Sequence, residues 1–301
     1  MTTNIIELQN VSKQYGKVTA LDQVSFTITG NQICGLLGRN GAGKTTLMHL
    51  LTAQLFASQG SIRIMGEEPY ENKRVLSNMC FIKESQQYSK SMRISDVLDI
   101  SSLIFPQWDR VYAERLIREF ELPSSRHVKK LSRGMTSALG IVVGLASRSQ
   151  VTIFDEPYLG LDAASRMMFY DLLIEDYSLH PRTIILSTHL IDEISKLLER
   201  VLVIDHGRLV IDRDADELRG MAFTVSGSRD KVAPFISSRR VLHQETFGTL
   251  QTATLLSTSG NEDRRKANEL GLEIGPVSFQ QLIVHLSASE QASMEKGDGT
   301  L

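Results

Sequence analysis

A glycine-rich octapeptide constrains this chain more than any other segment. Residues 38–45 read Gly-Arg-Asn-Gly-Ala-Gly-Lys-Thr, which fits the pattern of a phosphate-binding loop. The loop follows the apolar run Ile33 to Leu37 and opens a helical pattern. In that setting glycines let successive backbone N–H groups turn toward phosphates, and the helix N-terminus adds a positive dipole. The segment therefore predicts a nucleotide site at the end of a buried strand in an α/β fold.

Each side chain of the loop has an expected task. Lys44 reaches the β- and γ-phosphates, and the Thr45 hydroxyl binds Mg²⁺. The alternative, a merely flexible glycine-rich turn, is disfavoured by the strand before the loop and the helix after it. The residues expected to hold the nucleotide here are Gly38, Asn40, Gly41, Ala42, Gly43, Lys44, Thr45 and Thr46.

An acidic pair ends a second apolar run. Val151 to Phe154 predicts a buried strand, and Asp155 and Glu156 follow it directly. Such a strand delivers Asp155 to Mg²⁺. Neighbouring side chains on a strand point in different directions, so Glu156 can face the γ-phosphate and polarise an attacking water. Alone, an acidic pair is more often a helix cap or a solvated edge; with the loop upstream, the catalytic interpretation is favoured.

Composition excludes several classes of protein. The chain has 301 residues, 42% hydrophobic, with 33 Lys+Arg against 35 Asp+Glu and a net charge of −2. This balance lacks the basic excess of a chain whose main partner is nucleic acid. Two cysteines, Cys34 and Cys80, argue against a disulfide framework. Neither a signal peptide nor a transmembrane run is visible, so we expect a soluble cytoplasmic protein that reaches any membrane through a partner.

The pattern of elements changes along the chain. From Ile5 to about Val210, apolar strands alternate with helices, which is typical of a mostly parallel sheet. Further strands are predicted at Thr183 to Ser187 and Val201 to Asp205, and helices at Ser95 to Phe105 and Tyr112 to Glu121. We expect one domain that carries the nucleotide site over residues 1–218, with a helical subdomain at about 85–148.

After Gly220 a smaller α+β domain is expected over residues 219–287, followed by a polar tail at 288–301. Its order up to the sixth element, strand-helix-strand-strand-helix-strand, is the split arrangement of ferredoxin-like domains. The predicted elements are strands at Ala222 to Val225, Val241 to Glu245, Leu250 to Leu256 and Leu272 to Ile274, and helices at Asp230 to Ser237, Glu262 to Leu270 and Phe279 to Leu286. A regulatory or dimer-supporting role and a packing extension are equally compatible with this domain.

With these motifs the chain resembles the ATP-binding subunit of an ABC transporter over roughly Ile5 to Leu218. Residues 131–135, Leu-Ser-Arg-Gly-Met, resemble the family signature, usually Leu-Ser-Gly-Gly-Gln. The resemblance implies that Ser132 and Gly134 grip the γ-phosphate of ATP bound to the opposite subunit. Arg133 and Met135 depart from the pattern. Without the other motifs, this segment would be an ordinary helix start.

Other family elements appear in the expected order. The resemblance assigns Tyr15 to adenine stacking, Asp162 to the loop that crosses the dimer interface, and His189 to the switch that contacts the γ-phosphate. The plainer alternatives are packing for Tyr15, a helix cap for Asp162 and a structural histidine for His189. The family's glutamine after the strand at Phe81 to Lys83 aligns with Glu84, a further candidate Mg²⁺ ligand, and Gln86 is the alternative.

The resemblance implies an ATPase that dimerises on two ATP molecules with Mg²⁺ and drives a separate multi-span permease from the inner face of the cell membrane. A second ATP-binding subunit, identical or different, completes the pair, and no nucleic acid is expected. The single ATP domain with an extension resembles export-type (ABC-2) subunits. Residues 81–85 and 155–162 look like those of a group linked to antibiotic or cell-envelope stress. The alternatives are a soluble ABC ATPase acting on nucleic acid or the ribosome, and a non-hydrolysing ATP-sensing regulator.

Overall fold

The apolar runs predicted as buried strands lie side by side in one sheet. The computed structural model of the protein describes residues 4–84, 86–257 and 261–295. In it, β3 (Ile33–Leu37), β6 (Val151–Asp155) and β7 (Thr183–Ser187) are buried at every position. They pair in parallel, with β7 between the other two. Strands covered on both faces leave no room for polar side chains, which explains their nearly continuous apolar sequences.

This sheet brings distant parts of the sequence to one edge. Its strand order is β5-β6-β7-β3-β8-β9, where the flanking strands are β5 (Met79–Ile82), β8 (Arg200–Asp205) and β9 (Arg208–Asp214). β5 and β8 are also parallel to their neighbours. Parallel strands end at the same edge, so the residues that follow β3, β5, β6 and β7 meet there.

An antiparallel sheet covers one side of the helix that follows the glycine-rich loop. Its order is β2-β1-β4, formed by β1 (Asn4–Tyr15), β2 (Val18–Thr29) and β4 (Gln59–Ile64). The helix is α1 (Lys44–Leu51), whose Leu47 and Met48 are completely buried. They belong to one apolar cluster with residues of both sheets, so α1 is held between the two sheets. The short helix α2 (Lys73–Leu76) leads into β5.

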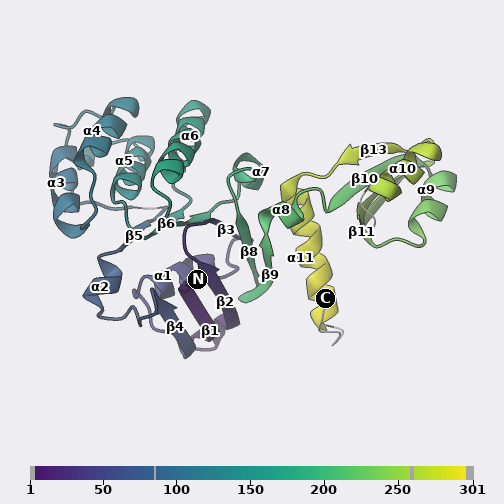
Figure 1. Ribbon diagram of the computed structural model, residues 1–301, viewed down its shortest axis with the longest axis horizontal. Helices are drawn as coiled ribbons and strands as arrows, with labels where there is room; N and C mark the ends of the chain where they lie inside the picture. Colours follow the sequence, from purple (N-terminus) through teal and green to yellow (C-terminus); the bar gives the residue numbers. More distant parts are fainter. Residues whose placement is uncertain (1–3, 85, 258–260, 296–301) are drawn as a thin grey trace. The chain divides into compact units, whose positions relative to one another are not determined.

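The helices of the middle segment lie together beside the parallel sheet (Figure 1). α5 packs on β5 and β6 and is buried from Ala138 to Ala146. The predicted helices in this region are present with ends shifted by one or two residues. The bounds are α3 (Ile94–Ile104), α4 (Arg110–Glu119), the 3₁₀ turn η1 (Val128–Lys130), α5 (Arg133–Ala146) and α6 (Ala163–Leu179). No helix in the described ranges has both the length and the apolar character needed to cross a membrane.

The chain forms two compact units, residues 1–189 with 197–209, and residues 190–196 with 210–301. The second unit contains an antiparallel sheet of order β11-β12-β10-β13, in the strand-helix-strand-strand-helix-strand sequence that we predicted. The expected limits at residues 218 and 219 stay predictions. Its elements are α7 (Ile191–Ile194), α8 (Ala215–Leu218), β10 (Ala222–Ser228), α9 (Arg229–Ile236), β11 (Val241–Phe247), β12 (Leu250–Leu256), α10 (Asn261–Glu269), β13 (Glu273–Pro276) and α11 (Phe279–Glu295).

One face of the second unit's sheet carries its core, where Phe223 and Val225 pack against residues of α9 and α10. The helix α11 extends to Glu295, past the predicted end at Leu286, because the polar residues that follow include good helix formers such as Ala, Glu and Gln. Residues 296–301 of the expected tail lie outside the described residues. α7 is joined to the start of α11 by a hydrogen bond from the Gln280 N–H to Asp192 Oδ1, 2.9 Å long.

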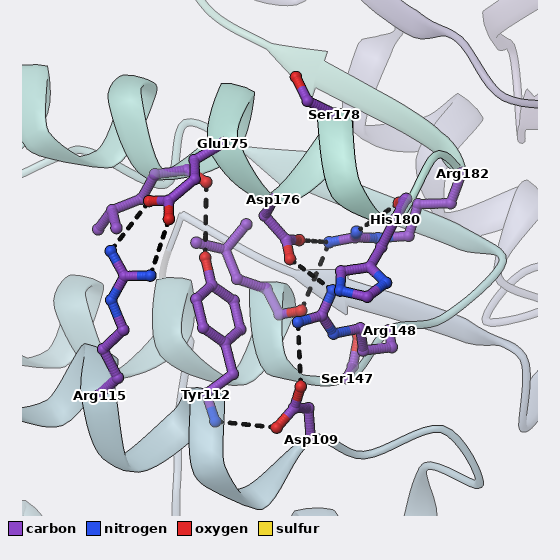
Figure 2. A network of polar contacts seen from close by, with 12 residues as sticks. Asp109, Tyr112, Arg115, Ser147, Arg148, Glu175, Asp176, Ser178, His180 and Arg182 are labelled. Carbon is purple, nitrogen blue, oxygen red and sulfur yellow. Dashed lines mark hydrogen bonds and ion pairs between the residues drawn. The ribbon is translucent and has the colours of Figure 1, made fainter.

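Two arginines share one buried carboxylate in the first unit (Figure 2). Asp176 on α6 is 2% exposed, and its oxygens lie 2.7 Å from Arg148 Nη1 and 2.7 Å from Arg182 Nη2. Arg148 also pairs with Asp109 at 3.0 Å, and its guanidinium stacks over the Tyr112 ring. The network joins the start of α4, the end of α5, the end of α6 and the residue before β7.

We predict that Asp176→Ala lowers the free energy of unfolding by about 3–5 kcal/mol, because it leaves two guanidinium groups buried without their shared carboxylate. Glu175→Ala on the same helix is the matched control. Glu175 pairs with Arg115 at a half-exposed site, where the loss is under about 1 kcal/mol. Urea denaturation of both variants measures the difference, and equal losses would contradict a supporting role for the buried network.

Candidate active site

The phosphate-binding pattern occupies the turn between β3 and α1. Gly38 has φ +147°, and a Cβ placed on it would lie 2.1 Å from the Ile204 carbonyl oxygen at the end of β8. No side chain tolerates that approach, so this position requires glycine. Arg39, Asn40 and Gly41 are exposed, as a loop that receives a ligand from solvent must be. Gly43 precedes the first residue of α1, which places the helix N-terminus behind the loop.

Lys44 curls back across this loop. Its Nζ donates hydrogen bonds to the carbonyl oxygens of Gly38, at 2.7 Å, and Arg39, at 3.2 Å. Partial burial lowers the pKa of the Lys44 ammonium, while the nearby carboxylates of Glu156 and Asp155 oppose that shift. The carboxylates of Glu156 and Asp155 therefore lie close enough to the Lys44 ammonium for their charges to act on it.

Thr45 and Asp155 meet at the end of β6. The Thr45 hydroxyl lies 3.5 Å from Asp155 Oδ2, and Asp155 is 7% exposed. Burial is the main cause that raises the pKa of the Asp155 carboxyl, and the negative charge of Glu84 adds to it. A buried carboxylate beside a hydroxyl offers the oxygen ligands that Mg²⁺ prefers. Within the described ranges no group of three His, Cys, Asp or Glu side chains is arranged to hold a metal alone, so phosphate and water oxygens would complete the shell.

Glu156 is held at the same edge in an unusual backbone conformation. Its φ is +48°, and its N–H donates to the Ser187 carbonyl oxygen at 3.0 Å. Its Oε2 lies 2.8 Å from His189 Nδ1 and accepts a hydrogen bond from the Tyr158 hydroxyl. Burial is the largest cause that raises the pKa of the Glu156 carboxyl, and the bonds from Tyr158 and His189 oppose it.

Tyr158 is the site residue that our sequence analysis missed. It is 3% exposed, and its hydroxyl contacts Glu156, Thr188 and His189. A carboxylate only accepts, so the single phenolic proton goes to Glu156, and the Tyr158 oxygen accepts from the Thr188 hydroxyl and the His189 N–H. Burial and the bond to Glu156 raise the pKa of Tyr158. The available signal was a tyrosine two residues after the acidic pair, since a buried phenol must find a polar partner.

The signature-like residues form a separate group on the same unit. The Ser132 hydroxyl caps α5 by accepting from the Met135 N–H at 3.2 Å. A Cβ on Gly134 would lie 2.5 Å from the Gly160 carbonyl oxygen. Asp162 caps α6 by accepting from the Ser165 N–H at 2.8 Å. Both helix-cap interpretations are therefore realised, and within the described residues no hydrogen bond or ion pair joins this group to Lys44.

Three other candidates occupy distinct surroundings. Tyr15 is 46% exposed at the end of β1, where the Lys13 Nζ lies 5.1 Å from the centre of its ring. The Glu84 carboxylate lies 3.5 Å from Arg133 Nη2. The Gln86 side chain instead accepts from the Lys83 N–H at 3.3 Å. Glu84 thus contacts Arg133, one of the two signature positions that depart from the family pattern, whereas Gln86 bonds within its own turn.

A glycine-rich loop between a strand and a helix, with an acidic pair at the end of another strand of the same sheet, defines a P-loop nucleotide-binding protein. Residues 21–159 match the family described as ABC transporter. The chain is 30% identical over 215 residues to the ABC transporter ATP-binding protein YtrB of Bacillus subtilis (strain 168), which covers 71% of this chain and 74% of that protein. The chain therefore belongs to the ABC transporter family, as an ATP-binding domain.

Other relatives and solved structures agree with this membership. The Doxorubicin resistance ATP-binding protein DrrA of Mycobacterium tuberculosis (strain ATCC 25618 / H37Rv) is 32% identical over 72% of this chain and 68% of its own length. The Nod factor export ATP-binding protein I of Sinorhizobium fredii is 32% identical over 69% of this chain and 62% of its own length. A structure titled "Structure of ATP binding subunit of ABC transporter" superposes with a TM-score of 0.65 at 23% identity, over 71% of this chain and 92% of that one, which establishes the fold.

We predict that Gly134→Ala destabilises the packing of α5 against the segment before α6, because the new methyl group would collide with a backbone carbonyl. The expected loss of unfolding free energy is about 1–3 kcal/mol. Gly140→Ala on the same helix is the control, since its Cβ would meet only the Ile82 Cγ2 methyl, at 2.9 Å, and an alanine favours a helix interior by about 1 kcal/mol. Thermal and urea unfolding compare the two; a larger loss at Gly140 would refute the assignment.

Proposed function

We propose that this chain is the ATP-hydrolysing motor subunit of an ABC transporter of the export type. The observation that carries the proposal is the contact of Glu156 with His189 at the sheet edge that also holds Lys44, Thr45 and Asp155. A general base, a phosphate-binding lysine and a metal-binding pair thus share one place. The relatives named for doxorubicin resistance and for Nod factor export support the export direction.

The proposed chemistry is mainly positioning and charge stabilisation. The loop N–H groups and Lys44 bind the β- and γ-phosphates, which displace the Gly38 and Arg39 carbonyls from the ammonium. Bound Mg²⁺, held by Thr45, Asp155 and Glu84, would neutralise charge that develops between the phosphates. Glu156 accepts a proton from the attacking water.

His189 is the γ-phosphate contact in this proposal. Because an ionised Glu156 only accepts hydrogen bonds, we assign the proton on Nδ1 of His189 to the bond with Glu156 Oε2. A phosphate oxygen also only accepts, so Nε2 contacts the γ-phosphate as the second N–H donor of a protonated ring. His189 therefore connects the general base, Glu156, to the γ-phosphate, and the Tyr158 hydroxyl holds Glu156 and His189 in position.

Each subunit would complete the site of a second one. Ser132 and Gly134 bind the γ-phosphate of the partner's ATP, Asp162 lies in the interface, and Tyr15 stacks on the adenine of its own nucleotide. The partner is an identical or a related ATP-binding subunit. Closure of the pair would move a multi-span permease, which keeps this chain peripheral on the cytoplasmic face of the membrane.

We predict that Glu156→Gln binds ATP normally but hydrolyses it about 10²–10⁴-fold more slowly, since an amide cannot act as a base. The variant should accumulate as a dimer in ATP. Phosphate release and size-exclusion chromatography with ATP measure the two effects. Glu175→Gln, at the half-exposed pair with Arg115, is the control for loss of a carboxylate. Unchanged turnover in Glu156→Gln would remove Glu156 from this role.

We predict that Tyr158→Phe lowers kcat roughly tenfold and leaves the KM for ATP unchanged, because the missing hydroxyl releases the Glu156 side chain without touching the nucleotide. Steady-state phosphate release at several ATP concentrations separates the two constants. Tyr177→Phe is a suitable control, as the Tyr177 hydroxyl bonds Asn31 and Glu199 away from the site. A raised KM with unchanged kcat would instead place Tyr158 in nucleotide binding.

A further inference from the structure

A cavity lies on the second unit's sheet, on the face opposite its apolar core. Thr224 of β10, Thr254 of β12 and His243 of β11 are neighbours in the strand register, and all three line the cavity. Gln281 and His285, from the first turns of α11, form another part of its wall. The volume is about 520 Å³, which lies within the range of small-molecule sites. All of the lining residues belong to the second unit.

A buried hydroxyl in this cavity lacks a partner. Thr254 is 6% exposed and lines the cavity, yet among the residues that the structure describes its hydroxyl makes no hydrogen bond. The next threonine on the same face, Thr252, does have one, because its hydroxyl lies 3.0 Å from that of Ser226. A buried polar group without a partner is costly. In the wall of a cavity, it marks a place where a ligand supplies the missing bond.

The charged side chains around the cavity are both negative. They are Asp192 and Glu245, and within the described part of the chain neither lysine nor arginine lines the cavity. Asp192 Oδ1 accepts from the Gln280 N–H at 2.9 Å, and Glu245 Oε1 lies 3.0 Å from His243 Nε2. Both carboxylates belong to exposed residues, so a ligand that enters from solvent can reach them.

Two imidazole rings stack beside these carboxylates. The centres of the His243 and His285 rings are 4.6 Å apart, and the ring planes differ by 13°. Burial is the largest cause that lowers the pKa of His285, the charge of His243 adds to it, and Glu245 opposes it. A neutral His285 leaves the carboxylates uncompensated. Rings in nearly parallel planes do not aim their nitrogen lone pairs at one shared ion, and the described ranges hold no group of three His, Cys, Asp or Glu side chains fit for a metal.

We infer that this cavity binds a small organic ammonium ion that carries hydroxyl groups, of the amino-sugar type. The carboxylates of Asp192 and Glu245 attract the ammonium group, which donates three hydrogen bonds and accepts none. The hydroxyl groups suit Thr224 and Thr254, since a hydroxyl both donates and accepts. An anionic ligand would instead meet two carboxylates with no lysine or arginine beside them. The inference does not depend on the proposed ATP hydrolysis.

The test uses D-glucosamine and D-glucose, which differ by an ammonium group in place of one hydroxyl. Isothermal titration calorimetry with the purified full chain, without ATP and at low salt, measures both affinities at about pH 7, where the amine is mostly protonated. We expect glucosamine to bind at least roughly tenfold more tightly than glucose, as hydrogen bonds to charged groups are the stronger ones. The NMR signals of the His243 and His285 rings should shift with glucosamine, which places the ligand in the cavity.

Two variants test the residues that carry the inference. Thr254→Val keeps the shape of the side chain and removes its hydroxyl, so it should weaken glucosamine binding about threefold to tenfold. Glu245→Gln removes one carboxylate and should weaken it about twofold to fivefold. Circular dichroism confirms that each variant is folded.

The matched controls are Thr246→Val and Glu269→Gln. Thr246 is an exposed residue of β11 that does not line the cavity, and Glu269 lies on α10, which packs on the opposite face of the sheet. Both controls should bind glucosamine as the wild-type chain does. Equal affinity for glucose and glucosamine, no binding of glucosamine, unmoved histidine signals, or equal losses in variants and controls would overturn the inference. Phosphate release is measured separately without sugar, so its absence would count against the proposed function alone.

Discussion

The register between β6, β7 and β3 is the constraint on which the rest of the site depends. Asp155 pairs with Ser187, and Ser187 also faces Leu36 at the end of β3. The three strands therefore end within one residue of each other, and the N–H of Glu156, the residue after β6, donates to the carbonyl oxygen of Ser187, the last residue of β7. A slip by one residue would turn Asp155 away from Thr45 and exchange the faces of every side chain in the strand. Complete burial on both faces makes such a slip costly, because polar ends would enter the core.

The sequence predicts this part of the molecule well because its signals are local. Three apolar runs, a glycine-rich loop and an acidic pair each occupy a few consecutive residues, and parallel pairing follows from their alternation with helices. The signals for Tyr158 and for the Arg148–Asp176–Arg182 network are of another kind. The sequence does not tell whether a tyrosine or a lone aspartate lies on the surface or in the core. Only the tertiary structure places Thr188 against Tyr158, and two arginines against Asp176.

Two of the departures from the family pattern, Glu84 and Arg133, are connected only in the folded chain. Glu84 and Arg133 are far apart in the sequence, and each weakens the match to the family when it is considered alone. In the structure they approach one another at 3.5 Å. The pair is exposed and contributes little to stability. The two opposite charges attract the segment after β5 to the first residue of α5, whereas neutral residues at the two positions would not attract each other.

The boundary between the two compact units falls immediately after His189. His189, which contacts Glu156, is therefore two peptide bonds away from the first residue of α7, which the Gln280 N–H and the Asp192 carboxylate join to α11. The same short stretch of chain therefore serves both units: it carries the histidine of the nucleotide site at one end and the helix α7 of the smaller unit at the other.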